Sequence, residues 1–211
     1  MLRRLTLLLF FLSFINAQIA LPTFQGVHKP QVGASCDQTI TINQSDRGWY
    51  TSNGYHTSSN QNTITGPGYT DAHSWFTFDL SGFSGGACGV TLRLEVERYN
   101  STASNCTSTI YDVSTSHDDL VTSHSYGSSS GQTIHADLGS GNSYGSATIS
   151  SSDVGDIIEY TLSAQAISDV NSAAGGWFSI GTTISNDNDN GWIRFSGSSE
   201  SRTHQIVVEY Q

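Results

Sequence analysis

Short stretches in which apolar and polar residues alternate recur along the chain from residue 36 onward. In residues 90–97 the aliphatic residues fall on one face of an extended strand and the charged residues on the other. Such a stretch has one face toward a core and one toward water. We predict nine strands: 38–42, 74–80, 90–97, 107–113, 144–149, 157–162, 177–183, 191–195 and 204–210. Because these stretches alternate with clusters of Gly, Ser and Asn, they predict an all-β fold, a single antiparallel β-sandwich (jelly roll) of about nine strands.

One segment departs from this pattern. Ala164, Ile167 and Val170 recur at helical spacing, and the pair Gly175–Gly176 follows where a helix would end. We therefore predict one short helix there. The Ser-rich residues 123–130 are predicted to be a surface loop.

The first 35 residues differ from the rest of the chain. Arg3 and Arg4 precede an apolar run that ends at Ile15, and Ala17 follows. This is the pattern of a secretory signal peptide, residues 1–17, and the run is shorter than the roughly 20 residues of a membrane span. Residues 18–35 show no period and are predicted to be an extended N-terminal lead, so the sandwich domain is 36–211. We expect a secreted, extracellular protein with no membrane span.

The charge of the chain excludes one class of partner. Charged residues make up 12% of it, the formal net charge is −10, and Lys29 is the single lysine. Nucleic acids are bound through clustered cations, so we expect no nucleic-acid partner. Without residues 1–17 the chain keeps six basic and 18 acidic residues, a net charge of −12. The remaining polarity is neutral hydroxyl and amide.

Three cysteines predict one disulfide and one unpaired thiol in an oxidising compartment. If residues 90–99 and 108–115 form a hairpin, Cys88 and Cys106 lie roughly 40 Å apart at about 3.3 Å per residue. Cys36 then pairs with one of them, and we prefer Cys36–Cys88. The third thiol is either buried or available to cross-link two chains.

Three Asn-x-Ser/Thr sequons begin at Asn43, Asn100 and Asn105. Each is a candidate glycosylation site if the source is eukaryotic. Asn100 and Asn105 fall in a predicted turn and are the preferred candidates.

Several motifs resemble those of a known group of proteins. They are Gln44-Ser45-Asp46-Arg47-Gly48-Trp49-Tyr50, Ser74-Trp75-Phe76-Thr77-Phe78-Asp79-Leu80-Ser81-Gly82, Ile110-Tyr111-Asp112-Val113-Ser114-Thr115 and Asp137-Leu138-Gly139-Ser140-Gly141. On these residues the chain resembles uncharacterised exported β-sandwich proteins, many of which carry a PEP-CTERM sorting tail. Residues 198–210 are similar to the final strand of DNRLRE-type jelly rolls, which look like carbohydrate-binding modules. The resemblance implies a sandwich fold and export. No hydrophobic sorting tail follows Gln211, so we expect no surface retention by that route.

Aromatic residues suggest a ligand class. Trp49, Tyr50 and Tyr55 occur in a segment rich in Gly, Asn and Ser, so we predict that their rings are exposed. Flat rings beside amides suit sugars, which have apolar faces and hydroxyl edges. These three residues are our predicted glycan contacts, whereas Trp75 and Trp177 lie inside apolar runs and are predicted to fill the core.

Two other chemistries deserve a test. Asp187, Asn188 and Asp189 lie in an Asn/Asp loop whose oxygens suit weak calcium binding, although a hairpin turn explains the same residues.

Three G-x-S-x-G matches arise in a chain rich in Gly and Ser, and none joins a predicted strand to a predicted helix as a nucleophile elbow must. We expect no catalytic residues and no cofactor apart from weak calcium.

These observations predict a secreted, non-catalytic component of an extracellular matrix, wall or coat, with glycans or matrix polymers as partners. One alternative is an acidic structural matrix protein that associates with calcium or mineral. Another is a secreted hydrolase, which would need a Ser or a carboxylate pair beside a His in one cleft.

Overall fold

The computed structural model describes residues 35–185, 190–197 and 201–211, which belong to one structural unit. The predicted signal peptide 1–17 lies outside the described residues, as does all but Ser35 of the predicted lead 18–35. The strands are β1 (Gln38–Thr51), β2 (Thr63–Thr65), β3 (Ala72–Asp79), β4 (Ala87–Glu95), β5 (Arg98–Asn100), β6 (Asn105–Asp112), β7 (Ser143–Ser150), β8 (Ile157–Thr161), β9 (Trp177–Ser185), β10 (Trp192–Ser196) and β11 (His204–Tyr210). The helices are α1 (His117–Leu120), α2 (Ser129–Asp137) and α3 (Ala164–Ser172), with a 3-10 turn η1 (Ser151–Asp153).

The fold is an all-β antiparallel sandwich, as predicted. Eight strands form one sheet in the order β7-β6-β9-β3-β1-β11-β4-β8, and β2, β10 and β5 form a second, smaller sheet. The paired strands of both sheets run antiparallel. All nine predicted strands are present, and β2 and β5 are additional three-residue strands that sequence patterning did not reveal.

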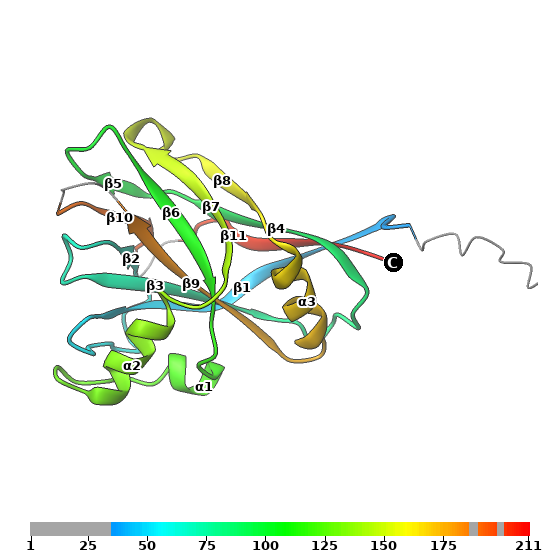
Figure 1. Cartoon of the computed structure of the whole chain (residues 1–211), viewed down its shortest axis with the longest axis horizontal. Coiled ribbons are helices and arrows are strands. Elements are labelled where there is room, and N and C mark those ends of the chain that lie inside the picture. Colours follow the sequence, from blue (N-terminus) through cyan, green and yellow to red (C-terminus); the bar gives the residue numbers. More distant parts are fainter. Residues whose placement is uncertain (1–34, 186–189, 198–200) are drawn as a thin grey trace, which may run out of the picture. The chain divides into compact units, whose positions relative to one another are not determined.

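Strand β1 joins two parts of the large sheet (Figure 1). Its first half pairs with β11, and its second half pairs with β3 after a register shift between Gln44 and Asp46. Apolar side chains from both parts meet in one core, which includes Phe76 and Phe78 of β3. Burial of this apolar surface is the main driving force for such a sandwich.

Residues 113–142, which connect β6 to β7, form a cap on the outer face of the sheet. Figure 1 shows its helices α1 and α2 beside β1 and β3, with α3 placed elsewhere. The prediction of a single helix was therefore incomplete: α3 is confirmed, but α1 and α2 were missed, and α2 begins inside the predicted loop 123–130. Each cap helix starts at a serine whose hydroxyl accepts a backbone N–H of the first turn, Ser116 for α1 and Ser128 for α2.

The expected hairpin of residues 90–99 and 108–115 does not form. Strand β4 pairs with β11 and β8, while β6 pairs with β7 and β9, so the two strands lie in different parts of the sandwich. After β4 the chain enters the short strand β5, which pairs with β10 in the smaller sheet. Residues 90–99 and 108–115 are therefore not joined as a hairpin.

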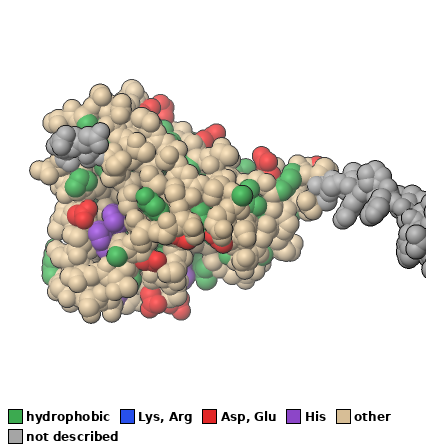
Figure 2. Space-filling model, in the orientation of Figure 1, with side chains coloured by type: hydrophobic (Ala, Val, Ile, Leu, Met, Phe, Trp, Pro, Cys, Tyr) green, Lys and Arg blue, Asp and Glu red, His purple; other side chains and the backbone are tan. Residues whose placement is uncertain are grey.

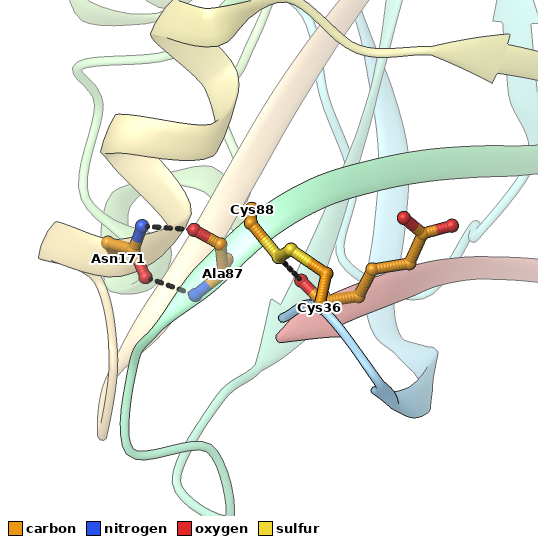
Figure 3. Close-up of a disulfide and its surroundings, with 5 residues drawn as sticks. Cys36, Ala87, Cys88 and Asn171 are labelled. Carbon is orange, nitrogen blue, oxygen red and sulfur yellow. Dashed lines mark hydrogen bonds between the residues drawn. A yellow bond between two sulfur atoms is a disulfide. The ribbon is translucent and has the colours of Figure 1, made fainter. Parts of the chain in front are cut away.

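The predicted disulfide Cys36–Cys88 is confirmed, with Cα atoms 6.3 Å apart (Figure 3). The Sγ atom of Cys88 lies 3.3 Å from the carbonyl oxygen of Glu209 on β11. Beside the bridge, the Asn171 amide bonds both backbone groups of Ala87, at 2.7 and 2.9 Å. Cys106 is the unpaired thiol; it is buried, and burial raises its pKa to about 11.

Among the helices of the described residues, none combines the length and the apolar character that a membrane span requires.

Candidate functional site

The most exposed tryptophan of the described residues stands at the start of β9. Trp177 is 43% exposed, follows the Gly175–Gly176 pair that ends the α3 segment, and pairs in register with Asp79 of β3. Its ring stacks on that of His117 from the cap, with ring centroids 3.8 Å apart and planes 4° apart. The prediction that Trp177 fills the core is therefore wrong, while the same prediction for Trp75, 1% exposed, is confirmed.

The His117 ring, which stacks on the indole, lies between two carboxylates. Its Nε2 lies 2.9 Å from Oδ2 of Asp46, and its Nδ1 lies 3.2 Å from Oδ1 of Asp118. The shorter and less exposed contact, with Asp46 on β1, orients the imidazole, and the imidazole stacks on Trp177. A ring whose orientation is set before binding loses little entropy when it receives a ligand.

A pocket of about 280 Å³ opens beside Trp177. It is lined by Asp112, Ser114, Tyr144, Asp169, Trp177 and Ser179, among others. The volume lies just below the usual range of about 300–1,000 Å³ for small-molecule pockets, so it suits one ring rather than a large ligand.

The polar groups of the pocket are held by hydrogen bonds. The Tyr144 hydroxyl donates to Oδ2 of Asp169 at 2.6 Å, and the backbone and side-chain N–H groups of Asn142 donate to Asp112 at 2.8 and 2.9 Å. Burial, and next the bond to Asp169, raise the pKa of Tyr144 well above its usual range. The hydroxyl therefore stays protonated and keeps donating.

Both pocket carboxylates lack a cationic partner. Within the described ranges, the hydrogen-bond partners of the Asp112 and Asp169 side chains are neutral donors, and no Lys or Arg lines the pocket. Each carboxylate oxygen has more than one acceptor site, so both groups can accept further hydrogen bonds from a ligand. Acidic side chains are also scattered over the mainly neutral face seen in Figure 2.

The predicted glycan contacts Trp49 and Tyr50 are not exposed. Trp49 is 3% exposed and Tyr50 is 0% exposed, because residues 44–51 continue β1 into the sheet and are not the irregular segment that we predicted. The Tyr50 hydroxyl instead faces three carbonyl oxygens of the cap, those of Asp119, Leu120 and Thr122, at 3.0–3.2 Å. Tyr50 therefore anchors the cap and offers no surface to a sugar.

Tyr55 is the member of the predicted trio that reaches the surface. It is half-buried and stacks on Tyr126, at 4.3 Å between ring centroids and 8° between planes, and Tyr126 is 69% exposed. Trp49 packs behind them against Tyr55 and Tyr69. This tyrosine surface (Tyr55, Tyr69 and Tyr126) is a second aromatic platform.

The remaining predicted sites divide into two groups. The calcium candidates Asp187, Asn188 and Asp189 lie outside the described residues. The sequon residues are all exposed: Asn43 on β1, Asn100 on β5 and Asn105 at the start of β6. Exposure is what glycosylation requires, so all three stay candidates.

One serine–histidine contact bears on the hydrolase alternative. The Ser128 hydroxyl lies 3.2 Å from Nδ1 of His124, but it also accepts the Gly131 N–H as the cap of α2. In a catalytic triad a third group orients the histidine. His124 Nε2 is buried without a hydrogen-bond partner, and no carboxylate of the described residues bonds the ring.

Sequence reasoning missed the pocket because its lining comes from three separate parts of the chain, 112–114, Tyr144 and 169–179. One local feature of the sequence could have indicated that Trp177 is exposed. The Gly-Gly pair before it places the indole at the start of a strand, where fewer neighbouring side chains cover it. Asp112 and Asp169 are 57 residues apart and carry no shared motif.

A scan of the chain against protein-family models finds no match, and a search of the curated proteins finds none either. The site must therefore be interpreted from its own geometry.

Proposed function

We propose that this protein is a secreted, non-catalytic glycan-binding component of an extracellular matrix, wall or coat, and that the sugar binds in the Trp177 pocket. The observation that carries the proposal is an indole 43% exposed in the wall of a small polar pocket. Exposed aromatic rings beside convergent polar groups are the usual composition of a specific binding site.

The pocket supplies both kinds of contact that a sugar ring offers. The apolar face of the sugar ring would lie on the exposed part of the Trp177 indole, which His117 supports by stacking. Its hydroxyls would donate to Asp112 and Asp169, which already accept bonds from neutral groups and have acceptor sites left. Hydrogen bonds to ionised acceptors are about twice as strong as neutral ones.

Two features support export. The disulfide Cys36–Cys88 belongs to an oxidising compartment, since cytosolic proteins rarely keep one. Residues 1–17 have the basic, apolar and small-residue pattern of a signal peptide.

The test is a glycan array read with and without calcium, using the wild-type chain and Trp177→Ala. We expect binding without calcium, and at least about a tenfold loss of affinity in the variant, because truncation of a central aromatic contact costs roughly 2 kcal/mol. Tyr126→Ala removes a still more exposed ring, from the tyrosine surface, and is the matched control.

Three results would contradict the proposal. Loss of binding in Tyr126→Ala but not in Trp177→Ala would move the site to the tyrosine surface. Binding that requires calcium would favour the acidic, calcium-associated matrix protein. New reducing ends released from a bound glycan would show that the protein is a hydrolase.

A further inference from the structure

Two histidines and an aspartate from separate segments meet where the cap contacts the sandwich. His73 lies on β3, His135 on α2, and Asp71 in the turn that precedes β3. One ligand atom of each, a ring nitrogen or a carboxylate oxygen, lies within 4.8 Å of the other two. We propose that this trio binds a divalent transition-metal ion such as Zn²⁺ and thereby joins the cap to the sandwich. Imidazole and carboxylate are ligands that zinc accepts.

The hydrogen bonds of the two imidazoles assign their tautomers. His73 Nδ1 lies 2.8 Å from the carbonyl oxygen of His135, and His135 Nε2 lies 2.7 Å from the carbonyl oxygen of Asp71. A carbonyl oxygen can only accept, so each of these nitrogens carries the proton and the other nitrogen of each ring carries a lone pair. Metal-binding histidines commonly donate their second nitrogen to a carbonyl or a carboxylate in this way.

The charges at the trio favour a cation. Burial lowers the pKa of both imidazoles, that of His135 to about 4, so at neutral pH no proton has to leave before the metal binds. The Asp71 side chain is 55% exposed and brings a negative charge and a route from solvent.

The geometry requires a small closure. Zn–N bonds of about 2.1 Å in a tetrahedral site place neighbouring ligand atoms about 3.4 Å apart, so the present span of up to 4.8 Å must shorten by about 1.4 Å. The two rings are stacked, with centroids 3.9 Å apart and planes 11° apart. The His135 nitrogen beside the Asp71 side chain is Nε2, 4.0 Å from Oδ2, and it carries the proton in the bond to the Asp71 carbonyl. Because the lone pair lies in the ring plane on Nδ1, the His135 ring must turn toward the ion and give up that bond, and the exposed Asp71 carboxylate can follow it. The fourth position would be taken by water.

The backbone around the trio is fixed without a metal. Thr70 and Asp71 have φ of 54° and 47°, and they are the non-glycine residues with positive φ among those described. The Ser52 N–H lies 3.3 Å from the Thr70 carbonyl oxygen and 3.1 Å from that of Asp71, which holds this conformation. At Gly139 a Cβ atom would lie 2.4 Å from Cε1 of His73, so the cap backbone rests directly on that ring. Such strained positions persist where the surrounding structure holds them, as around ligand sites.

Titration calorimetry and thermal unfolding of the untagged, disulfide-bonded chain test the site, with ZnCl₂ and CaCl₂ as the probes. We expect one Zn²⁺ per chain, a higher unfolding temperature with Zn²⁺, and no shift with Ca²⁺, which prefers six to eight oxygen ligands. Asp71→Asn keeps the shape of the side chain and tolerates positive φ, and it should weaken Zn²⁺ binding at least tenfold. His73→Gln should abolish it.

Asp118→Asn is the matched control, since Asp118 also lies beside a histidine and its side chain is 98% exposed. This variant should bind Zn²⁺ like the wild type. Histidine NMR spectra give a second readout that does not depend on any variant folding: Zn²⁺ should shift the ring signals of His73 and His135 and leave those of His204 unchanged. Equal affinity in Asp71→Asn, an equal response to Ca²⁺, or shifts confined to His117 would overturn the proposal.

Discussion

The sandwich and its cap are held by different kinds of contact. The sandwich core is one continuous cluster of mainly aliphatic and phenylalanine side chains. The buried cluster under the cap has five members, Tyr50, Trp75, Leu120, Ile134 and Leu138. Around it, the Tyr50 hydroxyl and the rings of His73 and His135 bond backbone carbonyls across the junction. The sandwich is thus stabilised by non-directional burial, whereas the position of the cap depends on a few directional bonds.

The largest effect should come from the sandwich core. Phe78 is fully buried, and Phe78→Ala should lower the free energy of unfolding by about 4 kcal/mol, because it removes buried surface and leaves a cavity. Urea denaturation measures the change.

Leu120→Ala under the cap should increase hydrogen exchange in α1 and α2 before it affects the strands. If hydrogen exchange gives the same unfolding free energy for the cap helices and for the strands in that variant, the cap and the sandwich do not differ in stability.

A fall in pH should weaken each region through a buried histidine. Burial lowers the pKa of His56, near the cap, and of His204, in β11, each to about 4 from 6.5. The unfolded chain therefore binds more protons between pH 6.5 and 4, so this stability is complete above pH 6.5 and is lost progressively as the pH falls toward 4. One such group contributes up to about 3 kcal/mol.

Unfolding free energies measured from pH 8 to pH 4 test this, with His56→Asn as the variant. Asparagine keeps a donor for the Trp49 carbonyl, which His56 Nδ1 contacts at 2.9 Å, but does not titrate. The pH dependence of the variant should be shallower over that window. An unchanged slope would mean that His56 is not among the groups responsible.

A smaller effect should follow from Tyr50→Phe, which removes one hydroxyl and keeps the packed ring. The hydroxyl has one proton, which the three cap carbonyls share, and its loss should cost about 1–3 kcal/mol because the buried acceptors lose their donor. Hydrogen exchange should rise in α1 and remain unchanged in β4 and β11. A uniform rise across the chain would show that the cap and the sandwich open together.

The smallest effect should be that of Asp118→Asn. Its contact with His117 Nδ1 is at the surface, so we expect less than about 0.5 kcal/mol by thermal unfolding. A larger loss would mean that the stacked pair His117–Trp177 depends on this carboxylate.

The sequence predicted the regular part of the fold well. Alternation in residues 90–97 and 204–210 marks strands with one buried face, and the spacing of Ala164, Ile167 and Val170 marks α3. Strands as short as β2 and β5 contain too few positions to show a period.

The cap and the pocket could not be predicted in the same way. Helices α1 and α2 have four and nine residues, rich in Ser, Gly, His and Asp, and they are held by contacts with β1 and β3 that are distant in sequence. Trp49 and Tyr50 looked like exposed rings because their neighbours are polar, yet β1 carries them into the sheet, between other strands and the cap. Tertiary context decides such positions.

The disulfide has a mechanical consequence. Gln38 of β1 and Ala87 of β4 both pair with Tyr210, so the starts of these two strands flank the end of β11. Cys36–Cys88 ties the flanking strands to each other across that end (Figure 3). A pulling force applied at residues 35 and 211 therefore cannot peel β1 away by itself. The force must break the hydrogen bonds of β11 to β1 and to β4 at the same time. Without the bridge, β1 would separate from β11 one hydrogen bond after another; with it, β1 and β4 resist the force together.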